Sequence, residues 1–253
     1  MMEFLKRQKA GATRQRIKFY PNSEKVGRLF EPPQPARKSR PDWFSSFPRR
    51  KDSVNYFQVT EGAENNMTVK GCSPFVDGLD AGYFLTLPCD VIFERENGTL
   101  KITAMSTGGI NSPITIRPSD ADWRTPWAEG VGPYDKLQLN FRSDWCFKTP
   151  RGWSALAIHP INRPELPFLM LGGVLDSDKW GESGNHPFFL HSAWQGILPK
   201  GTPMVQIIPF KRADWISETD RQGWQNYEKA SYELGSVCEG WYKKNAWSRK
   251  SYR

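Results

Sequence analysis

The chain has 253 residues, enough for one large domain or two small ones, and a hydrophobic content of 38% is enough to build a core. Its formal net charge of +8 is uneven: residues 1–50 hold 13 of the 35 Lys and Arg residues but only 4 of the 27 Asp and Glu residues. No apolar run is long enough to span a bilayer, and the first residues lack the apolar core of a signal peptide. The sequence therefore predicts neither a membrane protein nor a secreted one.

Residues 1–54 are predicted to form a basic, Pro-rich, extended arm rather than a domain. Prolines recur between residues 31 and 41, where they exclude helix interiors and central strands, and only residues 15–20 have strand character. The neighbouring aromatic side chains dock either on the chain's own body or on a partner. The positive charge suits an acidic partner, nucleic acid or solvent. The candidates for an assembly arm are Arg37, Lys38, Arg40, Trp43 and Phe44.

Residues 55–212 are predicted to be a β-rich body. Strand character marks residues 66–70, 82–87, 137–141, 188–190 and 204–210. Residues 90–94 and 100–104 flank Glu96-Asn97-Gly98, a strong hairpin signal. Residues 145–148 and 153–158 flank a Pro-Arg-Gly turn and are predicted to form a second hairpin. Many short strands separated by turns indicate an all-β sandwich or barrel.

Residues 213–253 are predicted to form one C-terminal helix, over 216–246, followed by a basic tail. The sequence from Ser217 to Asp220 resembles a capping box. One face of the helix is then formed by residues spaced three and four apart: Trp224, Tyr227, Ser231, Leu234, Cys238 and Trp241. We expect this face to dock on the chain's own body or on a neighbouring subunit.

The cysteines and histidines predict no metal site. The four cysteines form no Cys-x-x-Cys pair and are expected to be reduced thiols in a cytosolic protein. His186 and His191 are five residues apart on an expected strand, so their side chains point to opposite faces.

The segment from Trp145 to Phe210 resembles the dUTPase and dCTP-deaminase superfamily, whose fold is the β-clip. The matching pieces follow one another in the family's order: Pro150-Arg151-Gly152-Trp153, a strand ending at Pro160, Gly173-Val174-Leu175-Asp176-Ser177-Asp178, and a strand from Gly201 to Gln206. Upstream, Ala81-Gly82-Tyr83-Phe84-Leu85 resembles the family's first motif. The resemblance covers about half of the chain and implies a β-clip body and a homotrimer.

The resemblance also implies roles for individual residues. The carboxylate that matches Asp176 activates the attacking water in that family, and the glutamine that matches Gln206 binds the nucleotide. With Arg163 and Asp178 they are the candidate ligand-binding residues here, and Mg²⁺ is expected only if a nucleotide binds. Several family residues are replaced, however. Phe84 occupies the position of a family carboxylate, Lys179 that of the tyrosine that stacks on the nucleoside, and Pro203 that of an arginine. The family's Gly-rich phosphate loop is missing.

Each candidate also has a structural explanation. Asp176 and Asp178 fit a turn in which aspartate accepts hydrogen bonds from backbone N–H groups. Gln206 fits a strand with a buried, hydrogen-bonded amide. The sequence leaves both explanations open for these residues.

The whole chain further resembles an uncharacterised family of T4-like tailed phages and bacteria. The resemblance lies in Pro160-Ile161-Asn162-Arg163-Pro164, in the Gly173–Asp178 segment and in Gly201 through Arg212. It implies a phage origin but no activity. Together with a β-clip body that lacks several residues of the enzyme family, it leads us to expect a non-enzymatic virion component of the head, decoration or neck, made in the cytoplasm of a bacterial host. Its partners would be copies of itself and other virion proteins. The alternatives are a nucleotide-binding or nucleotide-hydrolysing protein with Asp176 as its catalytic residue, and a nucleic-acid binder acting through the basic arm and tail.

Overall fold

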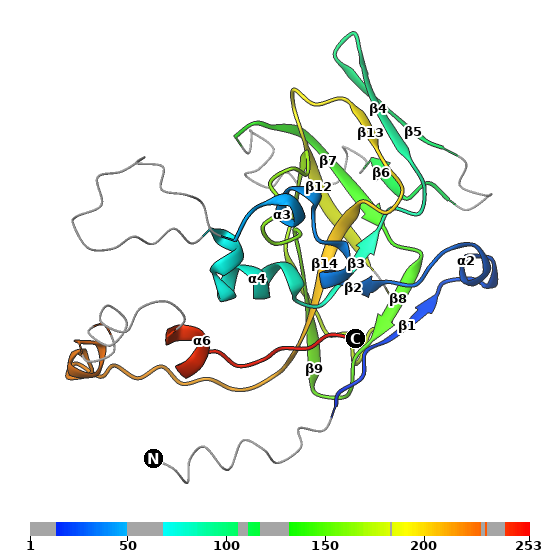
Figure 1. Ribbon diagram of the computed structural model, residues 1–253. Helices are drawn as coiled ribbons and strands as arrows, with labels where there is room; N and C mark the ends of the chain where they lie inside the picture. Colours follow the sequence, from blue (N-terminus) through cyan, green and yellow to red (C-terminus); the bar gives the residue numbers. More distant parts are fainter. Residues whose placement is uncertain are drawn as a thin grey trace, which may run out of the picture.

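The computed structural model describes residues 14–49, 68–105, 111–116, 132–182, 184–228, 231 and 241–253. These residues contain 14 strands in four antiparallel sheets, and their helices are short (Figure 1). The all-β class predicted from the sequence is therefore confirmed.

The largest sheet joins five segments that lie far apart in the sequence. Its strand order is β11-β9-β14-β3-β2. The strands are β11 (Gly173–Leu175), β9 (Trp153–Ile158), β14 (Pro203–Lys211), β3 (Tyr83–Thr86) and β2 (Gln34–Pro35). The central strand, β14, is buried from Pro203 to Ile207, as expected for a nearly continuous apolar run.

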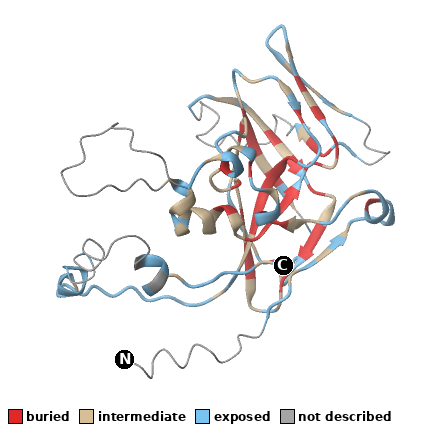
Figure 2. Cartoon of the chain, in the orientation of Figure 1, coloured by how far each residue is buried: buried red, intermediate tan, exposed pale blue. Residues whose placement is uncertain are grey.

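A second sheet packs against the first and closes the core. Its order is β10-β12-β7-β6, formed by β10 (Phe168–Met170), β12 (Asn185–His191), β7 (Tyr134–Arg142) and β6 (Ile114–Ile116). Buried residues gather where the sheets meet (Figure 2). Among them are Leu85, Val91, Phe93, Leu139, Phe141, Phe147, Phe168, Phe188, Met204, Val205 and Ile207. One continuous core therefore joins strands from several sheets.

The hairpin predicted around Asn97-Gly98 is confirmed. It consists of β4 (Val91–Glu96) and β5 (Thr99–Ala104), and β13 (Gly196–Leu198) pairs with the other edge of β4. Asn97 and Gly98 have φ values of 49° and 79°. Positive φ at both central residues suits the right-handed twist of the flanking strands.

The second predicted hairpin is wrong in its pairing. Both strands exist, but β8 (Trp145–Lys148) pairs with β1 (Lys18–Pro21), whereas β9 pairs with β11 and β14. The turn between β8 and β9 therefore carries the chain from one sheet to another. A turn signal fixes only local backbone geometry, and the burial of Phe147 in the core selects the partner of β8.

Residues 18–47 differ from the extended arm that the sequence predicts. Besides β1 and β2 they form α2 (Glu24–Leu29), a 3₁₀ turn η2 (Ala36–Ser39) and α3 (Asp42–Ser46). Val26, Ala36 and Phe44 are at most 2% exposed. This part of the N-terminal segment is packed on the body, because single apolar side chains spaced along it are buried. Residues 1–13 and 50–54 lie outside the described residues.

The strand predicted over residues 66–70 is wrong where the structure describes it. Residues Val69–Gly71 form a 3₁₀ turn, η3, and α4 (Ser73–Asp80) follows directly. The hydroxyl of Thr68 accepts a hydrogen bond from the Lys70 N–H, so a local cap takes the place of strand pairing.

The C-terminal helix is shorter than predicted. Residues 213–220 have no regular secondary structure, residues 224–228 are helical, and α6 spans Trp241–Asn245. The Asp220 carboxylate accepts a hydrogen bond from the Gln222 N–H, so this acid stands just before the helical residues rather than inside a helix starting at Ser217. Ser231 is helical and exposed, and the predicted face positions Leu234 and Cys238 lie outside the described residues.

Candidate functional site

Asp176 and Asp178 lie together in the turn that follows β11, and one arginine joins them. The Arg212 Nη1 donates to Asp178 Oδ1 at 2.9 Å and to Asp176 Oδ1 at 3.1 Å. The Gly152 N–H donates to Asp178 Oδ2 at 2.8 Å, and the Ser154 hydroxyl donates to Asp176 Oδ1 at 2.8 Å. The structure therefore brings this predicted pair together, but its hydrogen bonds run to the chain's own groups.

The two carboxylates differ in exposure. The Asp178 side chain is 4% exposed, and that of Asp176 is 52% exposed. The hydrogen bond from Arg212 lowers the pKa of Asp178 far below its usual value, and the Gly152 N–H lowers it further. Asp178 therefore stays an anion near neutral pH, whereas Asp176 keeps a face open to solvent.

This arrangement predicts a specific acid sensitivity. Because the pKa of Asp178 is lower in the folded chain than its ordinary value of 3.8, its stabilising contribution is complete above about pH 4 and is lost as the pH falls below that value. Asp178→Asn should lower stability at pH 7 and flatten the decline of the melting temperature between pH 4 and pH 2. Asp176→Asn is the matched control with a half-exposed carboxylate. An unchanged acid profile in Asp178→Asn would contradict the Arg212 contact.

Gln206 is fully buried in β14, and both the oxygen and the nitrogen of its amide are hydrogen-bonded within the chain. Its Oε1 accepts from the Ile161 N–H at 2.7 Å, and its Nε2 donates to the carbonyl oxygens of Gly78 and Ala81 at 3.0 and 2.6 Å. The amide therefore ties β14 to the end of α4 and to the loop after β9. Both N–H groups of the amide are donated to main-chain carbonyls, so this side chain has no donor left for a ligand.

Arg163 is 9% exposed and also binds groups of the same chain. Its Nη1 donates to the Ser39 carbonyl at 3.0 Å, and its Nε donates to Glu165. Burial alone would raise the pKa of Glu165, but hydrogen bonds from Arg163 and Trp43 outweigh burial and lower it. This arginine thus joins the N-terminal segment to the body.

Three of the five assembly-arm candidates contact the body. Arg40 Nε donates to Asp80 Oδ1 at 2.7 Å, Trp43 Nε1 donates to Glu165 Oε2 at 2.9 Å, and Phe44 is buried at a ring distance of 6.4 Å from Phe75. Arg37 and Lys38, like Arg40, are exposed. Lys38 donates to Gln34, and no described carboxylate pairs with either cation.

The four ligand-binding candidates do not converge on one cavity. Gln206 lies beside Ile158 of β9, whereas Asp176 bonds to Ser154 of the same strand. Four residues of strand separate these points by about 13 Å. Arg212, which organises the aspartates, was not singled out as a site residue, and a lone cation at the end of a strand gives no specific signal in the sequence.

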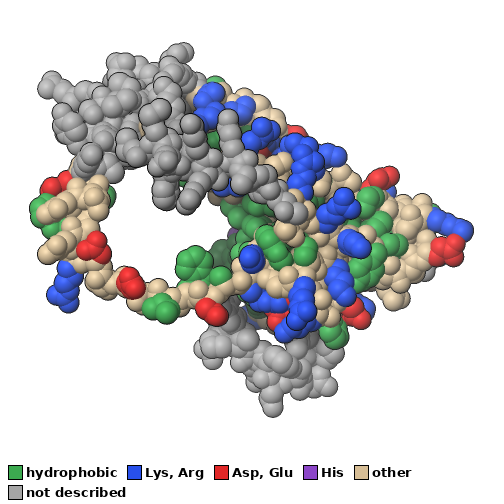
Figure 3. Space-filling view, turned by 90° about the horizontal axis from the view of Figure 1, so that it is seen from below, with side chains coloured by type: hydrophobic (Ala, Val, Ile, Leu, Met, Phe, Trp, Pro, Cys, Tyr) green, Lys and Arg blue, Asp and Glu red, His purple; other side chains and the backbone are tan. Residues whose placement is uncertain are grey.

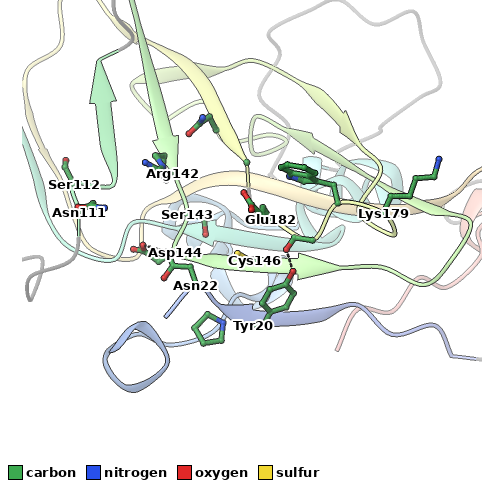
Figure 4. A pocket seen from close by; sticks show the side chains of 15 residues that line it. Tyr20, Asn22, Asn111, Ser112, Arg142, Ser143, Asp144, Cys146, Lys179 and Glu182 are labelled. Carbon is green, nitrogen blue, oxygen red and sulfur yellow. Dashed lines mark hydrogen bonds between the residues drawn. The ribbon is translucent and has the colours of Figure 1, made fainter. Parts of the chain in front are cut away.

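A polar cleft elsewhere on the protein contains none of those four residues (Figure 4). It measures about 770 Å³ and is lined by β1, the turn between β7 and β8, and the loop before β12. Asn22 Nδ2 donates to Asp144 Oδ1 at 3.0 Å. Burial raises the pKa of Asp144, and its Oδ2 is buried without a hydrogen-bond partner among the described groups. Charged residues of both signs line the cleft: Arg142, Lys179, Asp144 and Glu182.

Metal-binding geometry is not found among the described residues, which contain no group of three or more His, Cys, Asp or Glu side chains that could hold an ion. His159 hydrogen-bonds to the Met170 N–H, and burial lowers its pKa.

No helix in the described ranges has the length and apolar character needed to cross a membrane.

Comparisons with known proteins add no assignment. No protein-family profile matches the chain, and no curated protein sequence matches it. Function has to be inferred from the fold and from the surfaces just described.

Proposed function

We propose that the protein is a non-enzymatic structural component of a tailed-phage virion, built as a homotrimer on a degenerate β-clip body. The observation that carries this proposal is the state of the candidate ligand residues. Gln206, Arg163 and Asp178 are buried and bonded to groups of their own chain, so they act as internal ties. An enzyme of the dUTPase type needs such groups free to grip a nucleotide.

The sheet order supports the β-clip part of the proposal. The segments that carry the resemblance occupy four adjacent strands, β11, β9, β14 and β3. Gln206 pairs with Phe84 on one side and with Ile158 on the other. Motifs that are far apart in sequence are thus neighbours in one sheet.

The exposed C-terminal segment supports an assembly role. Trp215 and Ile216 are each 90% exposed, Trp224 is 56% exposed and Tyr227 is 73% exposed. Large apolar side chains left in solvent at this density mark surfaces that contact other proteins. A virion component has such contacts with copies of itself and with neighbouring proteins.

The experiment is a thermal-shift panel of nucleoside mono-, di- and triphosphates at millimolar concentration with Mg²⁺, on a sample whose mass is measured by light scattering. We expect a trimer whose melting temperature changes by less than about 1 °C with any nucleotide. A ligand at a hundred times its dissociation constant stabilises by about 2.7 kcal/mol, which is about 5–10 °C for a chain of this size. A shift of that size would overturn the proposal in favour of a nucleotide-binding protein, and Asp176 would be the first residue to replace.

A further inference from the structure

We propose that residues 213–222 form a C-terminal clasp that docks on a basic groove of a second copy of this chain. The inference rests on the proposed function, because it names the contact that would hold the assembly together. It assigns that contact to the C-terminal segment rather than to the N-terminal arm that the sequence suggests.

Both ends of the segment that contains the clasp are fixed to the body. Before it, the Arg212 N–H donates to the Gly152 carbonyl at 2.9 Å, and its guanidinium binds the two aspartates. Beyond α6, Trp247 Nε1 and Lys250 Nζ donate to Asp77 Oδ2 at 2.8 and 2.7 Å. The Tyr252 ring then packs at 6.1 Å against Tyr83. The chain therefore leaves the body and returns to it at defined points.

Between these anchors the clasp is open to solvent. Every residue from 213 to 222 is exposed. Figure 3 shows this part of the chain, with hydrophobic and acidic side chains, standing clear of the body with open space between them. Trp215 and Ile216 thus have no apolar partner within the described chain, and burial would have to come from another molecule.

The chain itself carries a groove that complements the clasp. It measures about 400 Å³ and is lined by both apolar and cationic residues. The apolar residues include Ile17, Phe19, Pro33 and Tyr83, and the cationic residues are Arg37, Lys38 and Arg253. Such a groove is large enough to take an aromatic side chain.

Charge complementarity indicates that the clasp of a second copy occupies this groove. The clasp contains three acidic residues, Asp214, Glu218 and Asp220, and one basic residue, Arg221. Arg37 and Lys38 have no ion-pair partner among the described carboxylates, so they are available to a segment of opposite sign. Clasp and groove are different surfaces of one chain. Their contact is therefore head to tail and closes into a ring when the rotation between copies allows it.

The test measures mass by light scattering for charge-reversed full-length proteins. Arg37→Glu with Lys38→Glu, or Asp214→Lys with Glu218→Lys, should reduce the trimer, three times the 29.1-kDa chain, to the monomer. All four substitutions in one chain should restore the trimer, because clasp and groove are again opposite in sign. Restoration also separates a lost contact from a damaged fold, since the same substitutions are present in the restored protein.

A second pair of variants tests the apolar part of the contact. Trp215→Ser with Ile216→Ser should abolish the oligomer, whereas Trp180→Ser, at another side chain that is 61% exposed, should leave it intact. Three results would each overturn the clasp. The wild-type protein could be a monomer, the oligomer could be unchanged in every clasp and groove variant, or the variant with all four charge reversals could stay monomeric. If the oligomer is unchanged in these variants and no nucleotide raises the melting temperature, the clasp is wrong but the proposed function is not contradicted. If a nucleotide stabilises the protein, the proposed function is wrong, independently of the result for the clasp.

Discussion

Gly82→Ala is expected to abolish the folded protein, with a loss of more than about 4 kcal/mol against a typical total of 5–15 kcal/mol. Gly82 has a φ of +66°, and a Cβ atom there would lie 1.9 Å from the carbonyl oxygen of Ile207. That oxygen belongs to the buried central strand β14, which cannot move without separating the sheet. The expected readout is loss of soluble protein or of the cooperative urea transition.

Gly98→Ala is the matched control for this prediction. Gly98 also has a positive φ, +79°, but no atom lies within 4 Å of the position that its Cβ would take. Its substitution therefore carries only the backbone cost of the left-handed region, about 1 kcal/mol. Equal losses in the two variants would contradict the close approach of β3 to β14.

Gln206→Leu is expected to lower the free energy of unfolding by about 3 kcal/mol, or the melting temperature by about 6–12 °C. Leucine fills much of the same volume but leaves the Ile161 N–H and the carbonyl groups of Gly78 and Ala81 without the partner they have in Gln206. An unmatched buried polar group costs about 1–3 kcal/mol, and partial relaxation reduces the sum. Urea denaturation measures the effect.

Gln138→Leu provides the control, because the same substitution there removes no hydrogen bond of the Nε2 group. That atom, in β7, is buried and has no hydrogen-bond partner among the described residues. Replacing a half-buried side chain whose amide nitrogen is unsatisfied with an apolar one should change stability by less than about 1 kcal/mol or increase it. If Gln206→Leu is as mild as Gln138→Leu, Gln206 does not have the internal role assigned to it, and a ligand-binding role becomes the better explanation.

The candidate site was only partly predictable. The Gly-Val-Leu-Asp-Ser-Asp segment places Asp176 and Asp178 in one turn, so their proximity follows from the sequence. Their common partner Arg212 does not, because it reaches them through the pairing of β14 with β9 and of β9 with β11. For Gln206 the sequence allowed both a ligand and an internal tie, and only the positions of α4 and the loop after β9 decide between them.

Local physical chemistry in the sequence determined the strand-rich character, the Asn97-Gly98 hairpin and most strand positions, since side-chain alternation and turn geometry act over a few residues. Only the tertiary structure decided which strands pair, as with β8 and β1, and that residues 18–47 pack on the body. It also decided that the clasp stays exposed. The physical reason is that strand partners and docking surfaces are selected by burying apolar area across long sequence separations, which no local pattern encodes.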